Sequence, residues 1–263
     1  MSKKMYEDKI ETPDNNQKIW RYMDFSKYVD MLTTNTLYFT RADKLEDPYD
    51  CSGMQFFGEQ YKQLSSAYPD EVKERTRQVN TFERLFVYLN CWHMNDVESA
   101  ALWRLYSENK YETIAIQSTF GKLNSEIEYK WARDGIRISK VKYDLENAGE
   151  PIGNPPEGRL FSILGWANII YKRPSFAHEK ELRAFIFQGY DKRKENYTLR
   201  NEAHLEKLMK ERDKFIRIPI DPAKLIEKVY VSPLAKDLFV ELVKNVSGKL
   251  EDRVLKSDLY ELY

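Results

Sequence analysis

The chain has 263 residues, of which 42% are hydrophobic and 32% are charged, a composition typical of a globular domain with a sizeable core. Lys and Arg together number 42, as do Asp and Glu, so the formal net charge is zero. This balance argues against a broad basic surface for nucleic acid, although a local basic patch, and with it nucleic-acid binding, stays open.

The cysteine count and the apolar segments indicate the cellular compartment in which the protein is expected. Two cysteines, Cys51 and Cys91, are too few for a disulfide framework and indicate a reducing environment. Residues 1–11 are polar and charged, unlike a signal peptide. The most apolar window, 160–171, is too short to cross a bilayer. We therefore expect a cytoplasmic protein without a membrane segment.

The N-terminal part predicts a leader followed by a strand–helix–strand unit. Residues 1–17 predict a flexible leader that contains a polar breaker beginning at Pro13. A short strand follows at 19–22. Apolar residues at i, i+3, i+4 and i+7 then predict a helix, which Asp24 caps and Asn35 ends. A second strand is predicted at 37–40.

The remaining chain mixes helices and strands without the strict alternation of a parallel sheet. The segment 147–158, rich in Pro and Gly, predicts a surface loop. Helices are predicted at 54–81 with a break at Pro69, and at 99–108, 159–170, within 191–213 and at 235–246. Strands are predicted at 85–92, 112–117, 136–143, 182–187, 215–220 and 228–231. The pattern predicts one α+β domain over 18–263, with a central mixed or antiparallel sheet flanked by helices.

Two early positions are candidates for binding chemistry. Arg21 stands on the first strand, from where it could project into a site or pair with an acid at the surface. Asp47 precedes Pro48 in the charged loop after the second strand. It is either part of a site or a turn initiator.

Trp103 and Tyr106 form the second candidate. They are three residues apart on a predicted helix, so their rings lie together. Core packing is the commoner use of such a pair, and a ring-stacking wall is the alternative.

The third candidate is the segment from His178 to Arg183. On an extended chain Glu179, Glu181 and Arg183 share one face. A guanidinium in that position can keep a carboxylate ionised and oriented. The alternative is a solvated, charged strand edge.

No metal site is predicted. Cys91 and His93 alternate, but no second Cys/His pair stands at zinc spacing, and the chain has three histidines. Phosphate-binding glycine loops and a nucleophilic serine motif are also missing from the sequence.

Several of these segments together resemble the bacterial family catalogued as domain of unknown function 2971, over roughly Trp20 to the C-terminus. The family often has a tryptophan just before its Glu-x-Glu, where this chain has Phe176-Ala177-His178. Some relatives lie near abortive-infection or phage-defence functions. The motifs are Trp20-Arg21-Tyr22, Leu37-Tyr38-Phe39, Glu46-Asp47-Pro48-Tyr49-Asp50, Trp103 with Tyr106, Glu179-Lys180-Glu181-Leu182-Arg183 and Val229-Tyr230-Val231-Ser232-Pro233.

The order of Arg21, a short helix, a second strand and a late Glu-x-Glu is also similar to ADP-ribosyltransferases. This resemblance implies NAD as cofactor, with Arg21 clamping its ribose or phosphate and Tyr38 or Thr40 lining the nicotinamide pocket. It implies that Glu181 stabilises the transition state and that Glu179 orients the acceptor. The remaining residues expected around NAD are Asp47, Trp103, Tyr106 and Arg183.

Two functions therefore stand side by side. The first is ADP-ribosyl transfer from NAD, or NAD cleavage, in a defence or toxin setting, with a small-molecule nucleotide and a macromolecular acceptor as partners. The second is a non-catalytic binding or interaction module whose polar cluster is structural. If the separated candidate residues Arg21, Asp47, Trp103, Tyr106 and 179–183 are functional, we expect them to converge in one cleft.

Overall fold

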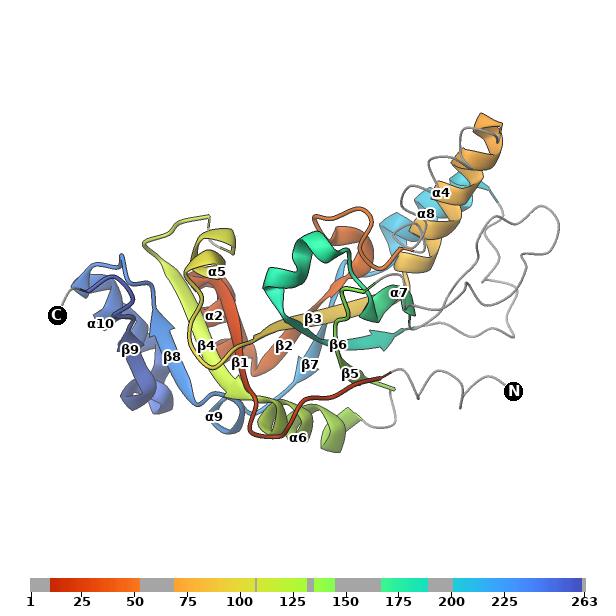
Figure 1. Ribbon diagram of the computed structural model, residues 1–263. Coiled ribbons are helices and arrows are strands. Elements are labelled where there is room, and N and C mark those ends of the chain that lie inside the picture. Colours follow the sequence, from red (N-terminus) through yellow and green to blue (C-terminus); the bar gives the residue numbers. More distant parts are fainter. Residues whose placement is uncertain are drawn as a thin grey trace.

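The computed structural model describes residues 10–52, 69–106, 108–131, 135–144, 167–188 and 201–261. In this part of the chain one continuous sheet has the strand order β5-β6-β3-β1-β4-β8-β9, with β2 paired to β3 and β7 paired to β2 (Figure 1). Neighbouring strands are antiparallel except β8 and β9, which are parallel. The strands are β1 (Lys18–Asp24), β2 (Thr36–Arg41), β3 (Val87–Met94), β4 (Thr113–Thr119), β5 (Arg137–Lys140), β6 (Glu181–Phe187), β7 (Phe215–Pro219), β8 (Lys228–Val231) and β9 (Val254–Lys256).

Helices cover both faces of this sheet, as Figure 1 shows. The main core lies between one face and the helices α2, α6 and α10. The predicted α+β class, with a mixed and mostly antiparallel sheet flanked by helices, is confirmed. The helices are α2 (Phe25–Thr34), α4 (Asp70–Arg84), α5 (Ala100–Leu105), α6 (Phe120–Trp131), α7 (Ala167–Ile170), α8 (Glu202–Glu211), α9 (Pro222–Leu225) and α10 (Asp237–Ser247), with 3-10 helices η1 (Ala42–Lys44), η5 (Pro174–Glu179) and η7 (Gly248–Arg253).

The helix α2 shows how local sequence sets the local structure. Asn35 takes the left-handed conformation at its end (φ 51°), as predicted for an asparagine cap. Of the predicted apolar stripe, Tyr28 is buried and Phe25 and Leu32 are partly buried against the core, and Met31, outside the stripe, is buried as well. The Tyr28 hydroxyl lies 2.7 Å from Ser247 Oγ at the end of α10, which joins the two helices on this face.

A fork in the sheet has no counterpart in the predicted elements. β1 pairs with the C-terminal end of β3, where Trp20 lies opposite His93, and β2 pairs with its N-terminal part, where Thr40 lies opposite Leu89. The stretch of β3 between these pairings, 90–92, therefore faces a fork between β1 and β2. Asn90 Nδ2 donates across it to the Tyr38 carbonyl oxygen (2.9 Å).

The remaining predicted elements differ mainly at their ends. The predicted helix at 235–246 is α10, which Gly248 ends with a positive φ of 54°. The predicted helix at 54–81 is described only from Asp70 onward and continues to Arg84. The predicted helix at 159–170 is described only as α7. The predicted loop at 147–158 lies outside the described residues.

Residues 10–17, predicted as part of a flexible leader, are anchored to the domain. The Glu11 carbonyl oxygen accepts from the Lys140 amide (2.7 Å), and the Asn15 carbonyl oxygen accepts from the Gly121 amide (2.9 Å). These bonds satisfy amides at β5 and at the start of α6 that would otherwise lack acceptors. Residues 1–9 lie outside the described part. Among the described residues no helix combines the length and apolarity needed to cross a membrane.

The Gly121 contact gives a first testable prediction. A Cβ at this position would lie 3.0 Å from the Asn15 carbonyl oxygen and 3.2 Å from Asn15 Cβ, and backbone yields poorly. Gly121→Val should lower the free energy of unfolding by ~1–3 kcal/mol, measured by urea denaturation. The control is Ser125→Ala, an exposed position on the same helix. A Gly121→Val protein as stable as wild type would contradict the anchoring of residues 10–17.

Candidate functional site

The site centres on Arg183 of β6, a buried arginine with 1% of its surface exposed. Its guanidinium donates to both carboxylate oxygens of Asp50 (2.8 and 2.7 Å) and to both of Glu181 (2.7 and 2.8 Å). A further bond goes to the Ile169 carbonyl oxygen (2.7 Å). These bonds occupy all five N–H groups of the side chain. Arg183 therefore fixes three chain segments but has no donor left for a ligand.

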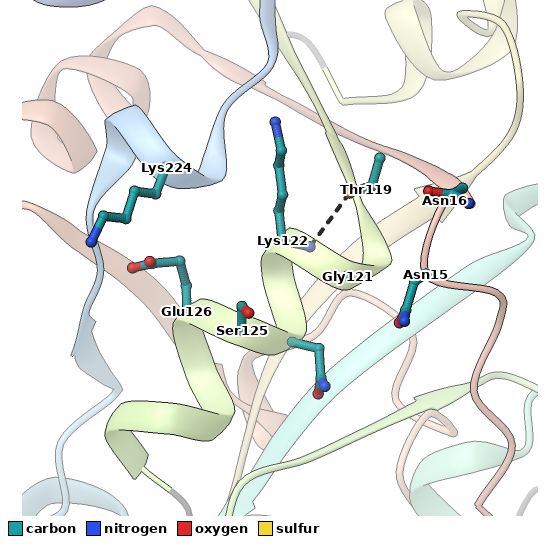
Figure 2. A pocket seen from close by; sticks show the side chains of 9 residues that line it. Asn15, Asn16, Thr119, Gly121, Lys122, Ser125, Glu126 and Lys224 are labelled. Atoms are coloured by element: carbon teal, nitrogen blue, oxygen red, sulfur yellow. Dashed lines mark hydrogen bonds between the residues drawn. The ribbon is translucent and has the colours of Figure 1, made fainter.

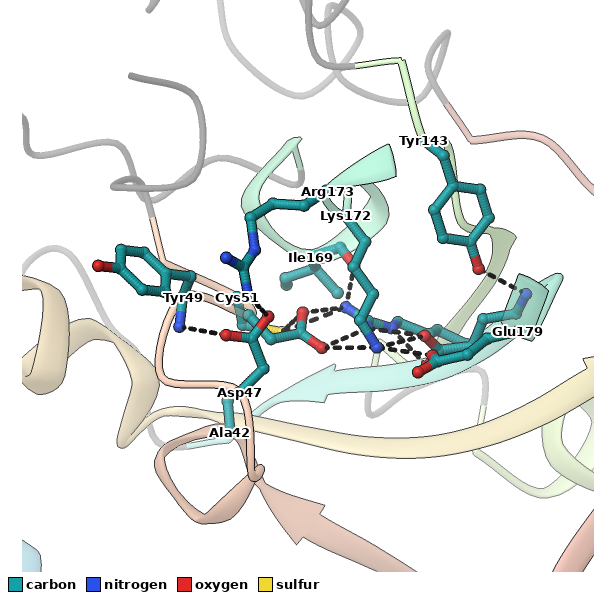
Figure 3. A network of polar contacts seen from close by, with 12 residues as sticks. Ala42, Asp47, Tyr49, Cys51, Tyr143, Ile169, Lys172, Arg173 and Glu179 are labelled. Carbon is teal, nitrogen blue, oxygen red and sulfur yellow. Dashed lines mark hydrogen bonds and ion pairs between the residues drawn. The ribbon is translucent and has the colours of Figure 1, made fainter. Parts of the chain in front are cut away.

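Lys172 is the second cation of this cluster and is also buried. Its Nζ lies 2.6 Å from Glu179, 3.4 Å from Asp50 and 3.5 Å from Glu181 (Figure 3). We call these five residues, Asp50, Lys172, Glu179, Glu181 and Arg183, the carboxylate cluster. Three carboxylates and two cations leave one net negative charge when all five are ionised.

The backbone between the two glutamates differs from the predicted extended segment. Glu179 ends the 3-10 helix η5, and Lys180 is left-handed (φ 40°) before β6 begins at Glu181. Both carboxylates still reach Lys172. A left-handed turn thus brings together the same two groups that alternation on a strand would have brought together.

The pKa values of the three carboxylates are shifted in different directions. Burial alone would raise the pKa of Glu181 and of Asp50, but Arg183 and then Lys172 outweigh it, so both pKa values lie below the ordinary range. The pKa of Glu179 is raised, by burial first and by Glu181 second, against Lys172. Within the described part of the chain Oε1 of Glu179 has no hydrogen-bond partner, whereas both oxygens of Glu181 are bonded.

Arg21 lies at the fork. Trp20 pairs with His93, and His93 pairs with Glu181, so these three side chains start on one face of the sheet. The Cα–Cβ bond of Arg21, the next residue, therefore points to the other face. Its guanidinium nevertheless lies between the strands and donates to the Tyr38 carbonyl oxygen (3.4 Å). Burial lowers the pKa of Arg21 to about 10, while Cys91 and Tyr106 oppose that shift, so the guanidinium stays charged at neutral pH.

Tyr38 and Thr40 lie on the same face as Glu181, through the pairing of Thr40 with Leu89 and of Leu89 with Phe185. Tyr38 is 36% exposed and stacks on Phe215, with ring centroids 4.4 Å apart. This ring is therefore open to a ligand on one side only.

The predicted ring pair divides into a core residue and an exposed one. Trp103 is buried, packs edge-on against Tyr22 and donates to Glu98 (2.7 Å), which is core packing. Tyr106 is 47% exposed. Burial of its hydroxyl is the main cause that raises the pKa of Tyr106, and the charges of Glu179 and Glu181 raise it further. The second effect indicates that the hydroxyl is within electrostatic reach of the cluster.

Asp47 initiates a turn and also makes an ion pair. Its Oδ1 accepts from the Tyr49 amide (3.0 Å), and its Oδ2 accepts from Arg173 (2.9 Å) (Figure 3). Arg173 in turn lies 4.8 Å over the Tyr49 ring. Asp47 thus borders the cluster through its loop, with both carboxylate oxygens engaged.

Sequence reasoning missed two members of the cluster, Asp50 and Lys172. Asp50 ends the Glu46-Asp50 motif, so the motif held a usable signal. Lys172 lies between the predicted helix at 159–170 and the candidate segment from His178, in a stretch that carries no recognised motif. Cys91 also borders the cluster. Burial first, and Glu181 second, raise its pKa well above the ordinary value, so its thiol is protonated and poorly nucleophilic at neutral pH.

Other site types find less support in the described residues. No group of three or more His, Cys, Asp or Glu there could hold a metal ion. A cavity of about 700 Å³ lies at α6 and α9, lined by Thr119, Lys122 and Lys224 among others (Figure 2). It is away from the cluster, and Lys122 in it pairs with Glu227 (2.8 Å).

Comparison of the chain with family models, curated proteins and solved structures gives no match. The geometry of the cluster and the fork therefore carries the functional argument.

Removal of Arg183 should show how strongly the cluster depends on it. Arg183→Met leaves Asp50 and Glu181 buried with one fewer cation, so the free energy of unfolding should fall by ~3–5 kcal/mol. The matched control is Arg217→Met, which breaks an exposed bidentate pair with Asp30 and should change stability little. Equal losses in both variants would contradict a structural role for the cluster.

The two glutamates should respond oppositely to neutralisation. A group with a raised folded pKa, such as Glu179, contributes stability below its unfolded pKa and loses it as pH rises through the folded pKa. Glu179→Gln should therefore raise the Tm at pH 7. Glu181 has a lowered pKa and contributes stability above its unfolded pKa, near 4, so Glu181→Gln should lower the Tm at pH 7. Differential scanning calorimetry of both variants at pH 7 and pH 4 checks the signs; the two differences should shrink at pH 4.

Proposed function

We propose that this chain binds NAD and breaks the bond between its ribose and nicotinamide, passing the ADP-ribosyl group to water or to a macromolecular acceptor. The observation that supports this is a pair of opposite charges linked electrostatically through Cys91: Glu181 raises the pKa of Cys91, and Cys91 opposes the lowering of the Arg21 pKa. The carboxylate cluster carries one net negative charge, and Arg21 in the fork is a cation held by a carbonyl oxygen. A nucleotide with a cationic pyridinium and an anionic pyrophosphate matches such a pair.

The chemistry needs a carboxylate near the ribose. The bond from C1′ to the pyridinium nitrogen breaks with its electron pair going to nicotinamide, which leaves as a neutral molecule. C1′ then becomes electron-poor, and a fixed negative charge beside it lowers the barrier. The acceptor forms the new bond to C1′ and gives up its proton. A carboxylate with a raised pKa is well suited to take that proton.

The contacts suggest a division of roles between the two glutamates. Glu181 is oriented by two bonds from Arg183, so it can present a stable negative charge. Glu179 has an oxygen without a partner in the described residues and a raised pKa, which suits a general base for the acceptor. Arg21 would hold the pyrophosphate. Tyr38, Thr40 and Tyr106 would line the bases, while Asp47, Trp103 and Arg183 would support the site without touching the ligand.

A second candidate function rests on a different observation. All five donors of Arg183 are used and the cluster is buried, which is also what a purely structural polar core requires. On that basis the chain would be a binding or interaction module whose partner contacts other surfaces. The cluster would then affect stability but no chemistry.

Nicotinamide release separates the two functions. Purified protein is incubated with NAD, with and without cell lysate, and free nicotinamide and labelled ADP-ribosyl products are quantified. We expect release by wild type, and loss of about 10²-fold or more in Glu181→Gln and Glu179→Gln. The control is Glu206→Gln, an exposed glutamate on α8, which should retain wild-type turnover.

Each variant must be shown to be folded, because Glu181→Gln is expected to lose stability on either function. Activity is therefore measured at least 15 °C or so below the Tm of the weakest variant. Turnover by wild type that survives in both glutamate variants would exclude these residues from catalysis. No turnover by wild type, with or without lysate, would favour the interaction module.

A further inference from the structure

His93 on β3 is a buried histidine that the proposed chemistry does not use. It lies directly opposite Glu181 in the pairing of β3 with β6, so the two side chains share a face. Its Nδ1 lies 2.5 Å from the Glu179 carbonyl oxygen. A carbonyl oxygen only accepts, so Nδ1 carries the proton and the neutral ring has its lone pair on Nε2.

The backbone on both sides of Glu179 and Lys180 is held by the same piece of β3. The His93 ring holds the carbonyl of Glu179, and the Met94 amide donates to the carbonyl of Lys180 (2.9 Å). Lys180 between them is left-handed, a conformation that disfavours a side-chain-bearing residue unless its surroundings impose it. These two bonds therefore hold the backbone that carries the Glu179 carboxylate, which Lys172 contacts directly (2.6 Å).

The energetics of His93 argue against a role in overall stability. One hydrogen bond contributes little net stability, whereas a buried acceptor without a partner costs at least as much. Nε2 is such an acceptor: it is buried and finds no partner among the described residues. The two effects offset each other or leave a net loss, so the hydrogen bond of His93 by itself adds little to overall stability.

The charge state of the ring fits this assignment. Burial lowers the pKa of His93, Lys180 and His178 lower it further, and the bond to Glu179 opposes them. The ring is thus neutral at pH 7 and keeps its single donor on Nδ1. It leaves the net charge of the neighbouring carboxylate cluster unchanged.

We propose that His93 is a positioning residue that fixes the Glu179 carboxylate through the carbonyl oxygen of the same residue. Its Nδ1 donor keeps the end of η5 in the turn that holds Glu179 against Lys172, in the enclosed surroundings that raise its pKa. Only the activity arm of the test below rests on the proposed function.

Two amide variants separate the donor from the bulk of the ring. The amide nitrogen of asparagine stands the same number of bonds from Cα as Nδ1, so His93→Asn can keep the bond to Glu179. The amide of glutamine reaches one bond further, toward the place of Nε2, so His93→Gln loses it. His204→Gln on α8 is the control for loss of a histidine elsewhere.

The first readout is the titration of Glu179, followed by NMR of carboxyl-labelled glutamate and assigned with Glu179→Gln. We expect the raised pKa of Glu179 in wild type, His93→Asn and His204→Gln. In His93→Gln it should fall toward the ordinary glutamate value of about 4.3, because the freed carboxylate gains water. The Tm should differ little among these proteins.

The second readout is NAD turnover. His93→Gln should lower kcat by roughly tenfold or more with little change in KM, and His93→Asn should restore most of it. An unchanged Glu179 titration in His93→Gln, or equal shifts in both amide variants, would falsify the positioning role. A large drop in Tm without a titration shift would assign His93 to the core instead. If no protein turns over NAD, the proposed function fails while the titration still decides the role of His93.

Discussion

The arrangement of this site depends on one guanidinium placed inside the protein. Arg183 brings five donors into the interior of the protein, and each must find an acceptor because an unpaired buried charge costs several kcal/mol. The acceptors come from three segments: Asp50 from the loop after β2, Glu181 from β6 itself and Ile169 from α7. The three segments must therefore meet at Arg183 in the folded protein. This meeting also positions the side chains beside them.

The same constraint makes two neighbouring glutamates different. Glu181 lies against Arg183, which holds it ionised, whereas Glu179 is bonded to Lys172, which it shares with the other carboxylates, and lies beside an existing negative charge. One negative charge remains uncompensated in the cluster. A cation, Arg21, lies in the fork between β1 and β2. The strands keep Arg21 and the carboxylate cluster from forming an ion pair with each other. Each can therefore bind a group of opposite charge on a ligand.

Buried arginines also organise the surrounding loops. Arg41 is fully buried and donates to the carbonyl oxygens of Met209 and Arg212 at the end of α8. Carbonyl groups at the end of a helix have no donor within the helix, and Arg41 provides one. Arg84 at the end of α4 donates to the carbonyl oxygens of Ala42 and Pro48. The segment that carries Asp47 and Asp50 is thus held from one side by Arg84 and from the other by Arg183. Guanidinium–carbonyl bonds thus join these loops to the sheet beside the apolar cluster of this region.

Local patterns in the sequence determined the class of fold and several elements, because the signals are short-range. Apolar spacing and an asparagine cap predicted α2, and a glycine stop predicted the end of α10. The pairing of Glu181 with Arg183 was also predictable, since residues two apart on a strand share a face. Only the tertiary structure decided that Trp103 is core, that Tyr106 is exposed and that Asp50 and Lys172 complete the cluster. Those outcomes depend on contacts between residues far apart in the chain, such as Tyr22 with Trp103 and Asp50 with Arg183, and no local periodicity encodes which distant segment supplies a partner.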